Sequence, residues 1–556
     1  MLDSLNYLAD SLRRLIDGLK ITYRYFIKEP IYTYNYPIKI KEVFSRWRGK
    51  VRVRAFNTLE TIYNRSENMY RSFNLPPCVS GCPANVDARG YVVLAGEGKF
   101  IEALNIERAQ NPTAMCFGNL CTAPCETTCS RGVQDHKPIA IRLIKKAISE
   151  YNLKVKLEDK ERYSFTIVGK ESGKRIAVIG AGPAGIACAH RLLRYGHKVD
   201  LFEKYDFCGG YLYSGVAFFR LDKDIMNKEY ENLITFTKNG RIFYNACIIS
   251  DEEKDKFKVI SYNDIKDLNG SINYLDKNSG ILFSELEENY DAVVIAAGAT
   301  KPRKLNLKNS DKVELIQAEW FLEDWNLGIR SYKIGKKVVV IGGGGTGIDA
   351  ARTCKKVFSD EVIIVDLLPK EDLPVAEEEK VEAEEDDNIK FICSVMPTEV
   401  VIDENNKIVG LKVAKCLWGP ITSSGRKKLI KTNEEFVIEC DTIILAVSRD
   451  IYIPFAPKDI VGSRGEIIVD GFDVTAYGFV YKFGQSSRSK VFAAGEACYG
   501  PQPAIVALAS GNRTAERIHM YLTNELPPVL DFEVQKVLGP LNVHKVLRKS
   551  EVLKVG

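Results

Sequence analysis

The stretch that decides the fold reads KRIAVIGAGPAGIACAHRLLRYGHKVDLFEK over Lys174–Lys204. The apolar run Ile176–Ile179 is typical of a strand buried in a parallel sheet. A glycine-rich turn follows it, and then an amphipathic helix from about Pro183 to Tyr195. A second strand, Lys198–Phe202, ends in an acidic residue. This order predicts a βαβ unit within a parallel α/β sheet.

Each glycine of the turn has a separate physical task. Gly180 allows the tight turn, Gly182 lets the backbone approach a pyrophosphate, and Gly185 lets the helix pack closely on the strand. The helix N-terminus carries about half a positive charge, which favours phosphate groups. Glu203 is placed to accept hydrogen bonds from ribose hydroxyls. This indicates a dinucleotide site, the alternative being a glycine-rich turn without a ligand. The predicted contacts are Gly180, Gly182, Pro183, Ala184, Gly185, Glu203 and Lys204.

A second unit of the same kind reads KKVVVIGGGGTGIDAARTCKKVFSDEVIIVD over Lys336–Asp366. We expect strands at Val338–Ile341 and Val362–Val365. The carboxylate of Asp366 would bond a ribose 2′-hydroxyl and repel a 2′-phosphate, so these residues favour NADH over NADPH. The alternative is that a distant basic residue selects NADPH. The predicted contacts of this second site are Gly342, Gly344, Gly345, Thr346, Gly347 and Asp366.

Composition excludes several classes of protein. The 556 residues are enough for three or four domains, and 45% of them are apolar. The net charge of +5 is too balanced to indicate a nucleic-acid partner. No segment approaches the roughly 20 apolar residues that cross a bilayer, and charges interrupt the N-terminal region where a secretory signal would lie. We therefore expect a cytoplasmic protein without a transmembrane segment.

Six of the 14 cysteines fall between Cys78 and Cys129, and none precedes Cys78. Scattered cysteines in a reducing compartment are usually buried small side chains, but a cluster of six needs another explanation. Four thiolates hold a [4Fe–4S] cluster. Zinc would also accept four cysteines at short spacing. The remaining alternative is a degenerate set that binds no metal.

The order of these motifs resembles the small subunit of glutamate synthase. It also resembles the N-terminal half of dihydropyrimidine dehydrogenase and the large subunit of electron-bifurcating transhydrogenases. The similarity covers about residues 65–525. The motifs that carry it are Cys82-Pro83 with Asn85, Cys121–Cys129 (CTAPCETTC), Gly209–Leu212 (GGYL) with Arg220-Leu221, Tyr290–Gly298 (YDAVVIAAG) and Val491–Glu496 (VFAAGE).

The resemblance implies FAD at the first dinucleotide site and NAD(P)H at the second. It adds flavin-site residues, namely Gly210, Leu212, Arg220, Gly298, Gly495 and Glu496. It also implies a [4Fe–4S] cluster, and one is favoured because relatives with two carry a further C-x-x-C ahead of Cys78; a second cluster is the alternative. In that reading Cys82, Cys121 and Cys125 are ligands, Cys78 or Cys129 completes the set, and Cys116 is the weakest candidate. The last helix of this region offers only Lys145 and Lys146, which are unsuitable ligands.

The sequence departs from the family pattern at three places. Glu496 stands where Asp is usual, which keeps the acceptor but lengthens its reach. Asp366-Leu367-Leu368 replaces the Tyr-Arg-Arg of NADPH-using relatives. Ala217 replaces a common proline, a change that we cannot interpret.

The expected fold is α/β: two Rossmann-like dinucleotide-binding domains, one inserted in the other, follow an α-helical iron–sulfur domain. The expected order is a docking extension (1–60), the iron–sulfur domain (61–165), the first segment of the FAD domain (166–329), the NAD(P)H domain (330–450), the second segment of the FAD domain (451–525) and a tail (526–556). Leu5 to Leu19 form a helical stripe among basic residues, similar to a short leader of an eight-iron ferredoxin subunit of respiratory complex I. The extension would therefore dock on redox partners, lie on a membrane surface or pack on its own domain.

We expect an FAD-dependent oxidoreductase subunit that moves electrons between NAD(P)H and an iron–sulfur centre. No Ser-His-Asp set or paired acid indicates a catalytic side chain, because the cofactors carry the chemistry. The partner would be a ferredoxin, a hydrogenase or a flavoprotein dehydrogenase in a hetero-oligomer, and the flavin could bifurcate electrons. The alternatives are a glutamate synthase small subunit-like NADPH-oxidising donor and a non-catalytic scaffold.

Overall fold

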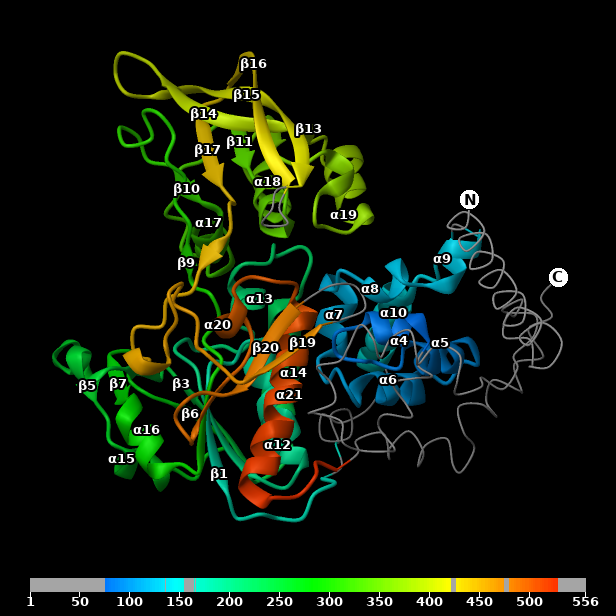
Figure 1. Cartoon of the computed structure of the whole chain (residues 1–556), viewed down its shortest axis with the longest axis vertical. Coiled ribbons are helices and arrows are strands. Elements are labelled where there is room, and N and C mark those ends of the chain that lie inside the picture. Colours follow the sequence, from blue (N-terminus) through cyan, green and yellow to red (C-terminus); the bar gives the residue numbers. More distant parts are fainter. Residues whose placement is uncertain are drawn as a thin grey trace, which may run out of the picture.

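The computed structural model describes residues 76–528, apart from 136, 155–164, 166, 422–426 and 475–479. Figure 1 shows a large α/β unit with a helical unit to its right and a smaller α/β unit above it. The expected docking extension, residues 1–60, lies outside the described residues, and so does most of the expected tail.

The helical unit confirms an α-helical domain around the cysteines. Its helices are α4 (Pro77–Gly81), α5 (Ala88–Gly96), α6 (Phe100–Arg108), α7 (Ala114–Leu120), α8 (Pro124–Thr127), α9 (Ser130–Asp135) and α10 (Ile141–Lys154). Cys82 directly follows α4, and Cys121 directly follows α7. A proline at the first turn of α8 places Cys125 within that helix. The cysteines therefore lie at the ends of short helices, where loops bring them inward.

The large unit is built on an eight-stranded sheet with the order β19-β20-β21-β8-β1-β2-β3-β6. Its strands are β1 (Arg175–Ile179), β2 (Lys198–Phe202), β3 (Gly240–Tyr244), β6 (Ile272–Tyr274), β8 (Ala292–Ile295), β19 (Gly471–Val474), β20 (Val480–Gln485) and β21 (Val491–Ala493). The predicted βαβ unit is confirmed, with α12 (Pro183–Arg194) between β1 and β2. β21 runs parallel to β8, so the chain does return to its first sheet.

The smaller unit holds a second parallel sheet, with the order β10-β17-β11-β12-β13. Its strands are β10 (Ile316–Gln317), β11 (Lys337–Ile341), β12 (Glu361–Val365), β13 (Lys390–Ile392) and β17 (Thr442–Leu445). Helix α18 (Gly345–Val357) joins β11 to β12, as predicted. An antiparallel sheet of β14 (Val395–Ile402), β15 (Ile408–Ile421) and β16 (Lys427–Glu439) covers this unit. β10 and α17 (Ala318–Asn326) belong here too, ahead of the expected boundary at 330.

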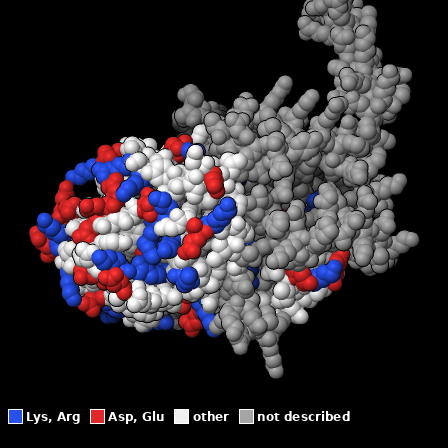
Figure 2. All heavy atoms as spheres, turned by 90° about the horizontal axis from the view of Figure 1, so that it is seen from below, with Lys and Arg blue, Asp and Glu red and all other residues white. Residues whose placement is uncertain are grey.

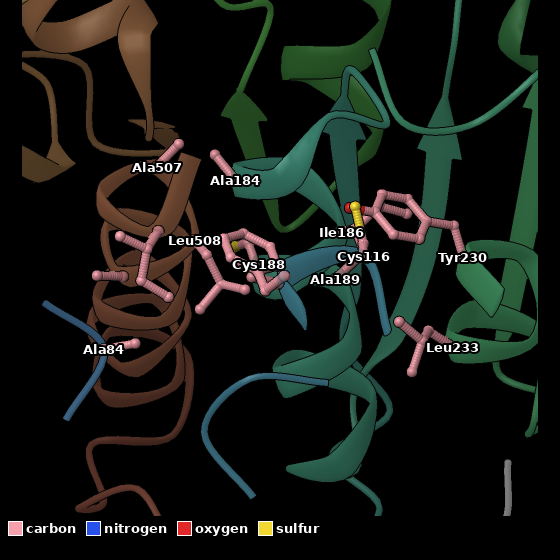
Figure 3. Packing of buried hydrophobic residues seen from close by; sticks show 14 of the residues in the cluster. Ala84, Cys116, Ala184, Ile186, Cys188, Ala189, Tyr230, Leu233, Ala507 and Leu508 are labelled. Carbon is pink, nitrogen blue, oxygen red and sulfur yellow. The ribbon is translucent and has the colours of Figure 1, made fainter. Parts of the chain in front are cut away.

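One hydrophobic core is shared between the helical unit and the large α/β unit. It includes Ala84 and Phe117 from the former, and Cys188 and Leu508 from the latter. Figure 3 shows Ala84 beside α21 (Ala504–Thr523), and Cys116 against Tyr230 of α14 (Lys223–Thr235). Such continuous burial fixes the helical unit against the sheet.

The described surface carries both signs of charge. Figure 2 shows Lys and Arg interleaved with Asp and Glu over the described part of one face. This pattern does not form the single-sign stripe of a nucleic-acid groove. Among the described helices, none is long and apolar enough to span a bilayer.

Candidate functional site: two dinucleotide loops and a cysteine cluster

The two glycine loops have the same geometry. Gly180 has φ +101° and Gly342 has φ +113°, in the region that L side chains rarely adopt. A Cβ on Gly185 would lie 1.9 Å from the carbonyl oxygen of Gly180, and one on Gly347 would lie 1.8 Å from that of Gly342. The first and third glycines of each loop are therefore required by the fold itself.

The middle glycines face open space. A Cβ on Gly182, Gly344 or Gly345 would meet no atom within 4 Å. Gly182 precedes α12 and Gly344 precedes α18, and neither helix start has a side-chain cap. Uncapped amides with free space in front suit the pyrophosphate of a dinucleotide. The residues present thus fit one dinucleotide at each loop.

Each acidic residue that was predicted to bind a ribose is hydrogen-bonded to backbone amides of its own glycine loop. The carboxylate of Glu203 accepts hydrogen bonds from the amides of Ala181 (2.7 Å) and Tyr205 (3.1 Å). Asp366 accepts from the amides of Gly343 (2.6 Å) and Leu368 (2.7 Å). Burial raises the pKa of Glu203. Because each carboxylate oxygen has two lone pairs, both acids can still accept ribose hydroxyls.

The flavin-side residues gather around the first loop. A Cβ on Gly210 would lie 3.1 Å from the Cα of Gly182, and one on Gly495 would lie 2.7 Å from the Cβ of Ala184. Leu212 is buried in α13 (Tyr211–Ser214) next to them. Gly298 has φ +75° and open space at its Cβ position. These residues lie in the unit that holds the first dinucleotide loop.

Contacts between the two units bring the loops together. The Tyr211 hydroxyl lies 3.2 Å from Oγ1 of Thr346, in the second loop. The guanidinium of Arg449 lies 3.9 Å from the Tyr211 ring centre, and its Nη2 is 3.1 Å from Oε2 of Glu496. The flavin-side segment therefore touches the second dinucleotide loop directly.

Two of the predicted contact residues have further partners in the structure. The Nζ of Lys204 lies 4.5 Å from the ring centre of Tyr205. Arg220 makes ion pairs of 2.7 Å with Asp349 of α18 and with Glu379 of α19 (Glu377–Val381). Arg220 thus joins the flavin-side segment to the second unit.

Helix α19 of the smaller unit also contacts the helical unit. Arg142 of α10 lies 3.7 Å from Glu379 and 3.5 Å from Glu378. It also donates to the backbone carbonyl of Cys121 at 3.4 Å. We call Arg142, Arg220, Asp349 and Glu379 the three-unit clasp, because they connect all three units.

All six cysteines of the helical unit are free: Cys82, Cys116, Cys121 and Cys129 are buried, whereas Cys78 and Cys125 are half-buried. Burial is the main cause that raises the pKa of Cys82 to about 11 and that of Cys125 well above its usual value. Within the described residues, no three His, Cys, Asp or Glu side chains surround a single metal ion. The choice between iron–sulfur and zinc therefore comes from the comparisons with known proteins.

Sequence reasoning missed Arg449 and Arg142, and it set Lys145 aside. Arg449 begins β18 (Arg449–Asp450), just after the last strand of the second sheet, and Lys145 faces the cysteines from α10. The sequence signal that could have found these residues is a basic side chain within an otherwise apolar stretch.

Comparisons with known proteins agree with this geometry. Residues 174–511 match the family described as pyridine nucleotide-disulphide oxidoreductase, and residues 56–157 match dihydropyrimidine dehydrogenase domain II, 4Fe-4S cluster. The structure of Mycobacterium tuberculosis FprA in complex with NADPH aligns with TM-score 0.50 and 18% identity, over 66% of this chain and 90% of that one. That likeness shows the fold alone.

Three curated relatives are subunits of larger enzymes. The chain is 28% identical to the NADP(+)-dependent formate dehydrogenase subunit beta of Moorella thermoacetica, over 85% of this chain and 64% of that one. It is 26% identical to the NADPH-Fe(3+) oxidoreductase subunit beta of Geobacter sulfurreducens, over 80% and 63%. It is also 26% identical to the glutamate synthase [NADPH] small chain of Escherichia coli, over 80% and 89%. The chain spans less than two thirds of the first two relatives.

These matches confirm the predicted family resemblance, the fold class and the cofactors FAD, NAD(P)H and [4Fe–4S]. The chain belongs to the pyridine nucleotide-disulphide oxidoreductase family, as an NAD(P)H-dependent flavin enzyme with an iron–sulfur domain ahead of its two dinucleotide sites.

Proposed function

We propose that this chain is the nicotinamide-oxidising subunit of a larger redox assembly, and that it passes electrons from NADH to a partner protein. The observation that carries the proposal is the contact of Tyr211 with Thr346, which places the flavin-side segment against the second dinucleotide loop. The helical unit shares a core with the flavin unit, which supports the proposal that a cluster bound by its cysteines would lie beside the flavin unit. The named relatives are themselves subunits.

The chain's own residues bind and orient the cofactors. The loops at Gly182 and Gly344 would hold the two pyrophosphates, while Glu203 and Asp366 would hold the riboses. When bound, the flavin supplies hydride acceptance and one-electron transfer, which no side chain can provide. Arg449 and Tyr211 would order the space between the two clefts. No described side chain needs to exchange a proton in this scheme.

We further propose NADH as the preferred donor, although the named relatives act with NADP(H). Both oxygens of Asp366 are fixed by backbone amides, so the negative charge is held where a 2′-phosphate would come. Leu367 and Leu368 follow it, and neither carries a charge that could bind phosphate.

The test is cofactor analysis of the full chain after anaerobic reconstitution. We expect bound FAD, acid-labile sulfide, and flavin bleaching that is faster with NADH than with NADPH. Flavin without iron would remove the iron–sulfur half of the proposal. A flavin that neither nicotinamide bleaches would favour the non-catalytic scaffold.

A further inference from the structure

One buried acid of the smaller unit has a carboxylate oxygen without a partner. Glu319 lies in the first turn of α17 and is 6% exposed. Its Oε2 accepts no hydrogen bond from any described residue. Such an oxygen is unfavourable in a folded protein, because burial has removed its water and no donor has replaced it. A ligand that donates a hydrogen bond to Oε2 would remove this penalty.

The register of the second sheet places Glu319 at the edge where ligands bind. Gln317 of β10 pairs with Leu445 of β17, and Leu445 pairs with Ile341 of β11. These three residues form one row across the sheet. Glu319 follows the row by two positions, as Gly343 of the second glycine loop does. Because dinucleotides bind outside the carboxyl ends of parallel strands, Glu319 stands at the same edge as that loop.

The order of the strands decides which half of a dinucleotide comes to Glu319. Asp366 follows β12, on one side of β11, and would hold the adenosine ribose. β17 and β10 lie on the other side of β11. A dinucleotide with its pyrophosphate at Gly344 therefore extends its nicotinamide half over β17 and β10. Ser448, just after β17, has φ +89°, and backbone strain of this kind is concentrated at ligand sites.

The face of α17 that carries Glu319 packs on the flavin unit. Glu319, Glu323 and Asn326 recur at intervals of four and three residues, so they lie on one side of the helix. The carboxylate of Glu323 accepts from the Tyr205 hydroxyl at 2.6 Å. Nδ2 of Asn326 donates to the carbonyl of Ser214 at 2.7 Å. Glu319 is therefore the member of this face nearest the ligand edge, between the second dinucleotide loop and the flavin unit.

The nicotinamide ring supplies the donor that Glu319 lacks. Its carboxamide has an amino group, which donates hydrogen bonds as the side-chain amides of proteins do. Burial raises the pKa of Glu319, while the positive charge of Arg449 opposes this rise. A carboxyl group keeps an acceptor oxygen whether it is protonated or not. Glu319 can thus accept from the amino group in either state.

We propose that Glu319 is a specificity-determining residue for the nicotinamide, and that its Oε2 accepts a hydrogen bond from the carboxamide amino group of the dinucleotide. This contact fixes the rotation of the ring about its bond to the ribose, and with it the face of the ring that meets the flavin. The inference deepens the proposed function and rests on it, since it names the group by which the second site recognises its donor.

The experiment compares two dinucleotides on the reconstituted full chain. One is NADH, and the other is reduced 3-acetylpyridine adenine dinucleotide, in which a methyl group replaces the amino group of the carboxamide. Rapid mixing gives the second-order rate constant of flavin bleaching with each, and the readout is the ratio of the two constants. We expect Glu319→Ala to lower the constant for NADH about tenfold to a hundredfold and to leave that for the analogue nearly unchanged.

Two further variants make the comparison specific. Glu319→Gln keeps the shape of the side chain and a neutral acceptor oxygen, so its ratio should fall between those of the wild type and Glu319→Ala. Glu314→Gln is the matched control, because Glu314 is exposed just ahead of β10, at the opposite end of the same strand. Its ratio should equal that of the wild type.

Two results would overturn the inference and leave the proposed function intact. One is a wild type that binds NAD+ and oxidised 3-acetylpyridine adenine dinucleotide with equal affinity, a measurement that needs no variant. The other is a ratio that the substitutions at Glu319 leave unchanged, although NADH still bleaches the flavin. Should Glu319→Ala fail to fold, Glu319→Gln alone decides this point. A wild-type flavin that no dinucleotide bleaches would instead contradict the proposed function itself.

Discussion

Asp366 combines two tasks in one side chain. It accepts amide hydrogen bonds from Gly343 and Leu368, and it stands at the end of β12, where the adenosine ribose of a dinucleotide would lie. Hydrogen bonds to a charged group are worth about 1.5–3 kcal/mol each. The residue should therefore control both the affinity for the nucleotide and the choice between its two forms.

We expect Asp366→Ala to lower kcat/KM for NADH by about tenfold to a hundredfold, in line with that energy. The kcat/KM for NADPH should fall less, because the substitution also removes the carboxylate that repels the 2′-phosphate of NADPH. Steady-state kinetics with both donors measures this. Asp360→Ala, at an exposed position just before the same strand, is the control. An unchanged ratio between the two donors would contradict the proposal for NADH.

His197 makes stability depend on pH. Its Nδ1 lies 2.7 Å from Oγ of Ser172, and its Nε2 lies 2.9 Å from Nδ1 of His519. Burial first, and then the charge of His519, lowers its pKa to about 4, while Asp291 opposes them. An unfolded histidine titrates near 6.5. Between these values the unfolded chain binds a proton that the folded chain does not.

Stability should therefore be fully present above pH 6.5 and fall as the pH drops toward 4, by about 3 kcal/mol from this residue. Urea unfolding of the wild type and of His197→Gln across this window gives the comparison. The variant should lose less stability over the same range. Parallel curves would show that His197 does not titrate as described.

Residues that act together with neighbours in the same short stretch of chain could be predicted from the sequence. Glu203 and Asp366 could be found because an acid at the end of the second strand belongs to the same short unit as its glycine loop. Arg449 and Lys145 could not, because their partners Tyr211, Glu496 and Cys82 lie far away in the chain. A buried charge has no sequence signature until the fold shows what faces it.

At the scale of the element, different glycines of each strand–loop–helix unit serve folding and ligand binding. A methyl group on Gly182 meets no protein atom, whereas one on Gly185 meets the Gly180 carbonyl at 1.9 Å. The first position is open in front of α12, and the second is closed between α12 and β1. The same contrast holds for Gly344 and Gly347 in the second unit.

We expect Gly182→Ala to fold with normal secondary structure but to bind FAD at least tenfold more weakly, since its methyl group would occupy pyrophosphate space. Gly185→Ala should instead lose several kcal/mol of stability, because helix and strand must move apart. Circular dichroism and flavin titration of the two variants distinguish these outcomes. A Gly182→Ala protein with unchanged FAD affinity would show that the pyrophosphate lies elsewhere.

Element prediction was accurate where periodicity was strong. Both βαβ units match the expected strands to within one residue, because each first strand is an apolar run that ends at a glycine turn and each second strand ends at an acidic residue. β10 was not anticipated in the second sheet, since two residues carry no periodicity and pair only through the fold. The boundary at 330 therefore comes later than the start of the second sheet.

At the scale of the whole molecule, the three-unit clasp fixes the orientation of the smaller α/β unit, which holds the second dinucleotide loop. Asp349 is buried, and besides Arg220 it accepts a hydrogen bond from the amide of Ala217 at 3.2 Å. Removing one partner of a buried ion pair costs about 3–5 kcal/mol, because the other charge is left unpaired. The units would then shift relative to one another.

We expect Arg220→Ala to slow flavin reduction by NADH about tenfold to a hundredfold, because small displacements between reacting groups have effects of that size. NADH affinity should change little. Rapid mixing separates the rate from the binding constant. Arg303→Ala is the control: its 2.6 Å pair with Asp450 also joins β9 (Lys301–Pro302) to β18, but it is exposed and should contribute little. Equal effects of the two variants would refute a special role for the clasp.

The order of the units could be predicted from the resemblance, whereas their mutual contacts could not. The motif at Val491–Glu496 indicated a return to the first sheet, and β21 pairs with β8 accordingly. The clasp depends on Glu379 of α19 and Arg142 of α10, which belong to no motif. Contacts between units depend on tertiary placement, which sequence periodicity does not contain.

The most direct test of the central claim is rapid-freeze EPR of the anaerobic holoprotein after mixing with excess NADH, with flavin absorbance recorded in parallel. The account predicts that the flavin bleaches first and that the signal of a reduced iron–sulfur cluster rises afterwards, with neither change in flavin-free protein. A cluster that is reduced equally fast without flavin would contradict the account, and so would a fully bleached flavin from which no electron reaches iron.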